Sequence, residues 1–170
     1  KIVDLDRCYS VCRLDTENGK ELILYTVHLS AYTSDGTIAT KQLEMLIEDM
    51  KKECEKGNYI VCGGDFNKDL LQQSGEIFGV SGEDYTWAQP FPLTLLEGTS
   101  LSLVAPYSEE TDAASCRDTG DVYSKEGQFN ITLDGFIVSD NVSVTESDVI
   151  DLEFEYSDYN PVYLNFTLNK

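Results

Sequence analysis

The stretch VCGGDFN, at residues 61–67, does most to decide how this chain folds. The apolar run YIVC at 59–62 leads into it and is typical of a buried strand. That strand delivers an acid and an amide, Asp65 and Asn67, and alternation along a strand predicts that they point to the same side. An aspartate here can ligate Mg²⁺ or orient a water, and an asparagine can hold a phosphate oxygen. The simpler interpretation is a glycine-rich turn with an Asx cap.

The elements before this stretch predict a hairpin and a helix. Residues 7–14 and 21–29 resemble two strands, with Asn18-Gly19 as a hairpin turn between them. Apolar residues then recur at offsets of one helical face and predict a helix over 37–56, which Gly57 ends. These apolar residues are Leu43, Leu46, Ile47, Met50 and Cys54.

The second half of the chain predicts further strands at 131–138, 142–149 and 162–168. Residues 68–98 are irregular, and 105–130 form a long polar stretch of the kind that is usually functional or mobile. The order hairpin, helix, strand and then strands predicts an α/β (α+β) fold, with a mixed sheet that has helix 37–56 on one face.

Composition limits the classes of partner. The 170 residues include 31 acidic and 12 basic ones, giving a net charge of −19. Such a surface repels long polyanions and offers no basic run for nucleic acid. It is either a solvated acidic surface or the surroundings of a divalent-metal site. The five cysteines and the single histidine argue against structural zinc, and we expect all five thiols to be reduced.

Three more segments carry polar residues in suggestive places. His28 ends an apolar strand, although a lone histidine is more often a packing residue than a catalyst. Asp134, in LDGFIVS at 133–139, puts an acid into an apolar strand and should have a partner there. Asp158, in SDYNPV at 157–162, stands just before the last strand. Each of these signals is weak separately.

Taken in order, the segments resemble the motifs of the endonuclease/exonuclease/phosphatase family, whose fold resembles deoxyribonuclease I. The family carries Thr-His-Leu, Gly-Asp-Phe-Asn, Leu-Asp-x-x-Phe-x-Ser and Ser-Asp-His-x-Pro-Val. Here the matches stand at 27–29, 64–67, 133–139 and 157–162. The resemblance implies a deoxyribonuclease I-like β-sandwich flanked by helices, with residues 1–170 as the C-terminal part of a single domain. Since Lys1 is not a natural start, we expect the N-terminal half to precede it.

The resemblance also implies a role for each matching residue. His28 would contact the scissile phosphate, Asp65 would orient or deprotonate the attacking water, and Asn67 would bind a phosphate oxygen. Asp158 would lie beside the metal, and Asp134 would orient a catalytic histidine. The implied cofactor is Mg²⁺ or Mn²⁺, with Asp158 and Asp65 as ligands, and the implied reaction is hydrolysis of a phosphodiester or phosphomonoester.

One position departs from the family pattern. Tyr159 stands where the family has histidine, and a phenol with a pKa near ~10 cannot readily carry positive charge near neutral pH. The family's metal-binding Glu and its Asn, which belong to its first half, have no match here. We therefore expect this chain alone to be inactive. A degenerate enzyme, an altered specificity and an engineered substitution are all compatible with Tyr159.

Two functions remain open at this point: a fragment of a metal-dependent phosphoesterase, of a bacterial type, and a non-catalytic binding or scaffold domain with the same fold. The charge favours a small phosphorylated substrate over nucleic acid. As partners we expect the missing N-terminal half or a second copy bound through the exposed sheet, without direct membrane contact. A cytoplasmic parent and an extracytoplasmic, membrane-anchored parent both fit.

Overall fold

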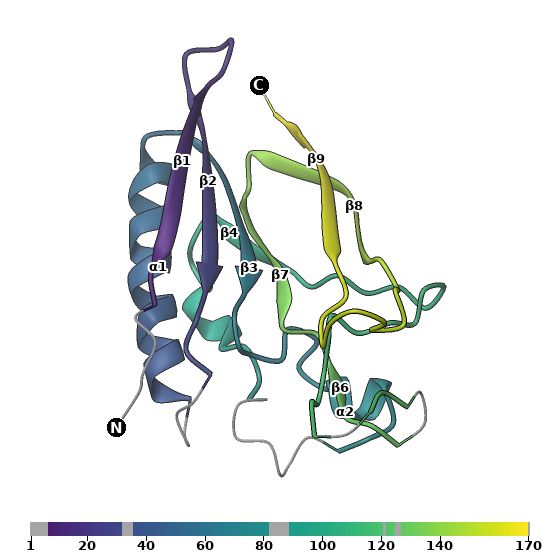
Figure 1. Ribbon diagram of the computed structural model, residues 1–170. Helices are drawn as coiled ribbons and strands as arrows, with labels where there is room; N and C mark the ends of the chain where they lie inside the picture. Colours follow the sequence, from purple (N-terminus) through teal and green to yellow (C-terminus); the bar gives the residue numbers. More distant parts are fainter. Residues whose placement is uncertain (1–6, 32–35, 82–88, 121, 125–126, 170) are drawn as a thin grey trace.

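The computed structural model describes residues 7–31, 36–81, 89–120, 122–124 and 127–169. Its centre is a five-stranded mixed sheet with the strand order β1-β2-β3-β7-β4 (Figure 1). Only the pairing of β2 with β3 is parallel among these strands, and the other pairings are antiparallel. The strands of this sheet are β1 (Tyr9–Asp15), β2 (Glu21–His28), β3 (Tyr59–Asp65), β4 (Leu101–Val104) and β7 (Asp134–Ser139).

The predicted hairpin and helix are confirmed. The turn between β1 and β2 places Gly19 at φ 78°, in the left-handed region that glycine adopts without strain. Helix α1 (Thr37–Glu55) then connects β2 to β3 and covers one face of the sheet (Figure 1). Past its end, the Gly57 N–H donates to the Cys54 carbonyl at 2.8 Å with φ 78°, as expected of a glycine that ends a helix.

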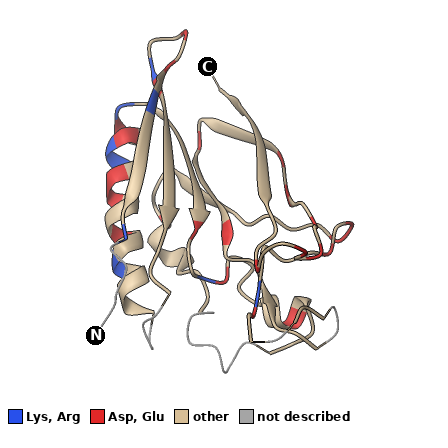
Figure 2. Cartoon of the chain, in the orientation of Figure 1, with Lys and Arg blue, Asp and Glu red and all other residues tan. Residues whose placement is uncertain are grey.

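The main core lies between α1 and the sheet. The predicted apolar face of α1 is buried there at Leu43, Leu46, Ile47 and Met50, while the outer face carries alternating acidic and basic residues (Figure 2). From the sheet side the core receives the side chains of Ile23, Tyr25, Ile60, Cys62 and Ile137. Each fully buried aliphatic side chain of this kind contributes roughly 1.5–3 kcal/mol, so the packing of α1 against the sheet contributes strongly to the stability of the fold.

A second, two-stranded sheet lies over the other face. Strands β8 (Val142–Val149) and β9 (Val162–Leu168) pair antiparallel, and Figure 1 shows them standing apart from α1, on the far side of the five-stranded sheet. A smaller cluster centred on Tyr59, Val61 and Val138 joins the two sheets. Side chains around this cluster are only partly buried: Leu22, Leu24, Val104, Leu164, Phe166 and Leu168. The predicted arrangement, a mixed sheet in a sandwich with a helix on one face, is confirmed.

The predicted strand at 131–138 is corrected to two strands. β6 (Asn130–Ile131) pairs with β5 (Cys116–Arg117), and β7 begins only at Asp134. Between these two strands, the backbone groups of residues 132 and 133 do not pair with a neighbouring strand. The Leu133 N–H donates to the Ser115 hydroxyl. The Thr132 carbonyl accepts the Leu70 N–H, and the Leu133 carbonyl accepts the Phe66 N–H. Strand β4 and strand β5 were not predicted, and the irregular stretch 68–98 contains the short helices α2 (Ser74–Ile77) and η1 (Leu93–Leu95).

All five cysteines carry free thiols, as predicted. Cys62 is fully buried and Cys54 packs at the edge of the main core, whereas Cys8 and Cys12 are exposed. In the described ranges, neither α1 nor α2 has the length and apolar character of a membrane-spanning helix.

Candidate active site

Two of the predicted residues meet at the ends of the parallel strands. His28 ends β2 and Asp65 ends β3, and the register makes them direct neighbours. Their side chains approach to 3.4 Å between Nε2 of His28 and Oδ2 of Asp65. The histidine side chain is 51% exposed and the aspartate side chain 8%. Because parallel strands present their carboxyl ends at one edge, polar residues in these two positions form a common site.

The two glycines before Asp65 permit the close packing of this edge. Gly64 has φ 142°, and a Cβ placed there would lie 2.1 Å from the carbonyl oxygen of Val27 on β2. At Gly63 a Cβ would meet the ring of Phe136 at 3.0 Å. The approach that these glycines allow is therefore that of the neighbouring strands, which brings His28 and Asp65 together.

The Asp65 carboxylate contacts three other residues of the site. Its Oδ1 accepts the Asn67 N–H at 2.7 Å, and its Oδ2 accepts the Tyr159 hydroxyl at 3.0 Å. Burial raises the pKa of Asp65, while the hydrogen bonds from Asn67 and Tyr159 and the nearby side chains of His28 and Arg7 oppose that rise. The carboxylate is thus kept from bulk water but faces polar groups on both oxygens.

Asn67 reaches the site by a turn, which corrects the expectation from strand alternation. It lies beyond the end of β3 and adopts φ 47°, a left-handed conformation that asparagine tolerates better than most residues. Its backbone N–H makes the Asx turn with Asp65, and its side-chain Nδ2 donates to the Leu29 carbonyl at 2.7 Å. The glycine-rich turn with an Asx cap is therefore confirmed, and the roles of Asp65 and Asn67 in binding a metal, water or phosphate remain predictions.

Tyr159 lies in a segment that is hydrogen-bonded to β5. The backbone of Tyr159 bridges to Cys116, and the Arg117 N–H donates to the Asp158 carbonyl at 3.0 Å. Asn160 is buried and locks the segment through its backbone N–H to Ser115 and its side-chain Nδ2 to the Ala114 carbonyl at 3.1 Å. Burial first, and then the charge of Asp65, raise the pKa of Tyr159. At neutral pH the phenol is therefore a neutral hydrogen-bond donor.

Asp134 lies next to this group on β7. It is the register partner of Asp65 across the β3–β7 pair. Asp134 is half-buried, and the partner that was expected for it is Ser115. The Ser115 hydroxyl donates to Oδ2 of Asp134 at 2.8 Å and accepts the backbone N–H groups of Leu133 and Asp134. Burial, and secondly the charge of Asp65, raise the pKa of Asp134 to about 7.

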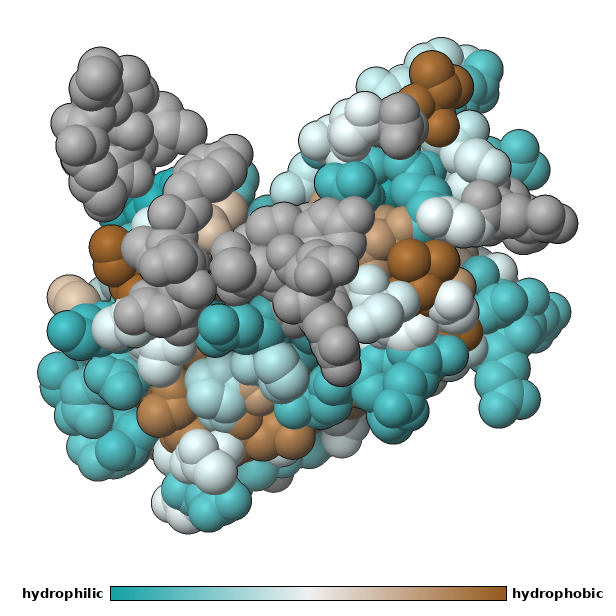
Figure 3. Space-filling model, turned by 90° about the horizontal axis from the view of Figure 1, so that it is seen from below, coloured by the Kyte–Doolittle hydropathy of each residue, from teal (hydrophilic) through white to brown (hydrophobic). Residues whose placement is uncertain are grey.

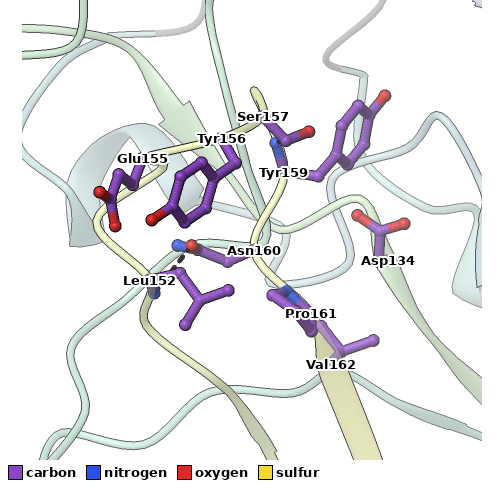
Figure 4. A pocket seen from close by; sticks show the side chains of 9 residues that line it. All are labelled: Asp134, Leu152, Glu155, Tyr156, Ser157, Tyr159, Asn160, Pro161 and Val162. Atoms are coloured by element: carbon purple, nitrogen blue, oxygen red, sulfur yellow. Dashed lines mark hydrogen bonds between the residues drawn. The ribbon is translucent and has the colours of Figure 1, made fainter.

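Two pockets adjoin Tyr159. A small pocket of about 160 Å³ is lined by Asn67, Asp158 and Tyr159 together with Arg117. A larger one, of about 460 Å³, has Asp134 and Tyr159 on one side and Leu152, Glu155 and Tyr156 on the other (Figure 4). All six predicted residues thus lie around one end of the five-stranded sheet. Seen from that end, the described surface is mostly hydrophilic with scattered hydrophobic side chains (Figure 3).

Sequence reasoning missed three residues of this site. Ser115 hydrogen-bonds to Asp134. Asn160 fixes the segment that carries Tyr159, and Arg117 lines the small pocket. Ser115 and Arg117 lie in the polar stretch 105–130, which has no periodicity to place them. Asn160 occupies the variable position of the SDYNPV segment, so only its burial in the folded chain identifies it.

The described residues do not by themselves fit a divalent cation. Among them no group of three or more His, Cys, Asp or Glu side chains is arranged to hold a metal ion. Oδ1 of Asp65 is bonded to Asn67, and Oδ2 is shared between Tyr159 and His28. Cations of this type prefer about six oxygen ligands, so the assignment of Asp65 and Asp158 as metal ligands remains a prediction.

No family model and no curated protein sequence matches this chain. Solved structures do match. A mannosyl-6-phosphatase of Bacteroides thetaiotaomicron is 15% identical with a TM-score of 0.58, over 95% of this chain and 57% of that one. Zebrafish (D. rerio) TDP2 complexed with a single-strand DNA product is 15% identical with a TM-score of 0.59, over 95% and 62%.

A third match bears the family name that the motifs suggested. It is an endonuclease/exonuclease/phosphatase from Beutenbergia cavernae, 14% identical with a TM-score of 0.63, over 98% of this chain and 41% of that one. The chain therefore spans less than two thirds of the length of these solved proteins. The arrangement of its sheets and these similarities show that the chain has the deoxyribonuclease I-like fold of the endonuclease/exonuclease/phosphatase proteins.

Proposed function

We propose that this chain is part of a phosphoesterase domain and that it binds the scissile phosphate of a small phosphate ester at the end of β2 and β3. The observation that carries the proposal is the buried Asp65 carboxylate, 3.4 Å from the exposed imidazole of His28. Phosphate-ester hydrolysis needs a carboxylate to position water and donors to neutralise the phosphoryl oxygens. This pair supplies both kinds of group at one sheet edge.

Each residue has a chemical task in this proposal. His28 donates a hydrogen bond to a phosphate oxygen, and Arg117, on the wall of the small pocket, adds positive charge near Asn67. Asp65 orients a water and accepts its proton as the water oxygen bonds to phosphorus. The ester P–O bond then breaks, the leaving oxygen takes up a proton from solvent, and Asp65 returns the proton that it accepted to solvent. Raising the pKa of Asp65 by burial makes it a better base for the first step.

Tyr159 limits the rate of that reaction. Its hydroxyl occupies Oδ2 of Asp65, and its raised pKa leaves it poorly suited to exchange protons near neutral pH. A water that is to be activated must share or displace this hydrogen bond. Loss of general acid–base help typically costs about 10²–10⁴-fold in rate. We therefore infer weak or absent turnover by this chain as it stands.

Dependence on a divalent metal belongs to the same proposal. Asp65 and Asp158 are the carboxylates that would contribute, and the remaining ligands would come from outside the described residues. Support comes from the fold alone, since the described donor set does not fit a cation. No step given above passes through a metal.

The substrate class follows from charge. The solved relatives include one named for a sugar phosphate and one that holds single-strand DNA. With a net charge of −19 this chain offers little attraction to a long polyanion. A small phosphate ester is therefore a better candidate than a nucleic acid. Affinity for DNA plotted against salt should show almost no slope, whereas a nuclease would show a steep negative one.

The test is hydrolysis of a generic phosphodiester and a generic phosphomonoester, with Mg²⁺ or Mn²⁺ and without either. The longest obtainable polypeptide containing this chain is compared with its Tyr159→His variant. Turnover that appears or rises only in Tyr159→His, by about 10²-fold or more, supports the proposal. Tyr156→His is the matched control, because Tyr156 is 84% exposed, and it should change nothing.

A second function, a binding domain without chemistry, is favoured by one observation: Tyr159 ties up the oxygen of Asp65 that would hold a water. His28 is the only histidine, so its NMR signals report directly on anion binding. If phosphate shifts those signals and neither the parent protein nor Tyr159→His shows turnover, the chain is a phosphate-binding domain and the hydrolase proposal is wrong.

A further inference from the structure

A third pocket adjoins the candidate site on the side of α1. It has a volume of about 320 Å³ and shares His28 with the site, so we call it the His28 pocket. Ligand pockets usually measure about 300–1,000 Å³, so this one can hold a small organic group. Its walls come from residues 7–9 at the start of β1, residues 28 and 29 at the end of β2, and Gln42 and Met45 of α1.

The lining of the His28 pocket is largely apolar. Tyr9, Leu29 and Met45 provide an aromatic ring and two aliphatic chains. Leu29 is buried, whereas Met45 is 70% exposed on α1. Methionine is well suited to pack against ligands of varied shape.

The charge of the His28 pocket differs from that of the rest of the molecule. Among the described residues, those that line it include Arg7 and His28 and no acid. The larger pocket beside Tyr159 carries Asp134 and Glu155 instead. In a chain of net charge −19, a pocket wall without acids is the side from which an anionic ester can approach Asp65 with least repulsion.

Part of the pocket wall is held in place by interactions of its own. The ring of Tyr9 packs against Tyr25 with centroids 5.8 Å apart, and the Tyr25 hydroxyl donates to Asp49 of α1 at 3.1 Å. Gln42, another lining residue, donates to the Ser30 hydroxyl and accepts the Ser30 N–H. A preformed wall of this kind lowers the entropic cost of binding.

We propose that the His28 pocket receives the organic group of the substrate, and that this group is aromatic or short-chain aliphatic and uncharged, joined to a phosphate monoester. The inference rests on the proposed function, because it is the phosphate at His28 and Asp65 that places the organic group in the pocket. Arg7 and His28 both line this pocket, and His28 also belongs to the candidate site.

The test compares phenyl phosphate with inorganic phosphate by titration of the His28 NMR signals. Phenyl phosphate should bind roughly tenfold tighter, because burying one ring removes apolar surface from water. Met45→Gln, which keeps the chain length but adds a polar amide, should reduce that advantage by about threefold and leave inorganic phosphate unaffected. Leu152→Gln is the matched control, since Leu152 is 46% exposed and lines the larger pocket.

Cysteine labelling gives a readout that does not depend on affinity differences. Cys8 lines the His28 pocket and Cys12 does not, and both are exposed. Saturating phenyl phosphate should protect Cys8 from iodoacetamide and leave Cys12 reactive, as followed by mass spectrometry.

The outcomes separate the two proposals. Inorganic phosphate that shifts the His28 signals, with phenyl phosphate binding no tighter, overturns the pocket assignment and leaves the proposed function standing. An advantage that is lost in Leu152→Gln but kept in Met45→Gln also overturns it, because the organic group then lies in the other pocket. If neither anion binds at all, the proposed function fails and this inference fails with it.

Discussion

The Tyr159 hydroxyl donates a 3.0 Å hydrogen bond to Oδ2 of Asp65, the same oxygen that lies 3.4 Å from Nε2 of His28. Two side chains, one from the end of β2 and one from the segment before β9, thus converge on one buried carboxylate. The tyrosine hydroxyl provides a hydrogen-bond donor for the buried carboxylate of Asp65. Because it occupies that oxygen, it competes with any water that Asp65 would activate.

Removing this hydroxyl should raise the pKa of Asp65 further. In Tyr159→Phe the carboxylate loses a donor that stabilises its charged form, while its burial stays. Carboxyl ¹³C titration by NMR should show the Asp65 transition at higher pH, with a loss of stability at neutral pH of about 1–2 kcal/mol. Tyr156→Phe, at an exposed tyrosine nearby, should leave the transition in place. An unchanged Asp65 titration in Tyr159→Phe would mean that the hydrogen bond is not formed in solution.

Asp134 should make the protein less stable as pH rises. Burial holds its folded pKa at about 7, above the unfolded value of ~3.9. The folded state therefore binds the extra proton between these values, and stability falls as pH rises from ~4 through 7. Asp134→Asn, which keeps an acceptor for Ser115, should be more stable than the parent at pH 8 by about 1–3 kcal/mol and similar to it at pH 4.

Urea unfolding at the two pH values measures this difference. Asp140→Asn is the control, since Asp140 is exposed just beyond the end of β7. Its variant should differ from the parent by a similar amount at both pH values. A difference for Asp134→Asn that does not grow between pH 4 and pH 8 would contradict the raised pKa.

Glu53 should stabilise the protein with the opposite pH dependence. Its buried carboxylate accepts hydrogen bonds from Arg13, Lys56 and Asn58, which hold its pKa at about 2. Because the unfolded value is ~4.3, this stability is present above that pH and is lost as pH falls toward 2. Glu53→Gln should cost about 2 kcal/mol at pH 7 and progressively less below pH 4.

The matched variant for Glu53 is Glu48→Gln. Glu48 also lies on α1 and pairs with Lys51 at 3.2 Å, but its side chain is 59% exposed. Exposed pairs contribute about 0–1 kcal/mol, so this variant should hardly change the urea midpoint. Equal effects of the two substitutions would show that the contacts of Glu53 add nothing beyond a surface ion pair.

Gly64 should be the least replaceable residue of the site. An alanine there would place Cβ 2.1 Å from the Val27 carbonyl, and φ 142° is strained for any side chain. We expect Gly64→Ala to cost about 3 kcal/mol or more and to displace the His28 NMR signals. Gly19→Ala, with φ 78° and no atom within 4 Å, isolates the conformational cost, which should be roughly 1–2 kcal/mol. Comparable losses for both would indicate that β2 and β3 separate easily at this point.

The elements that depend on residues close together in the chain were predicted correctly from the sequence. The helical spacing from Leu43 to Met50, the Asn18-Gly19 turn and the apolar run before Asp65 each depend on residues close together in the chain, and each formed as predicted. The place of His28 beside Asp65 also follows, since a helix between two strands makes them parallel neighbours and aligns their ends.

What the sequence did not show are contacts between distant segments. The break at Thr132 arises because Ser115 and the loop after β3 take the backbone hydrogen bonds there. The Asn67 amide is positioned by a left-handed turn and the Leu29 carbonyl, where alternation along a strand suggested a simpler cause. Neither partner can be identified from spacing.

The sequence by itself therefore determined which residues end the strands and which side chains could meet phosphate, because periodicity and turn chemistry act over a few residues. Only the tertiary structure decided that the Tyr159 hydroxyl hydrogen-bonds to Asp65, that Ser115 hydrogen-bonds to Asp134, and that a pocket with no acid among its described lining residues opens beside His28. Those facts depend on how the segment 157–160 docks on β5 and how α1 lies against β1 and β2, and such packing is set by the whole core.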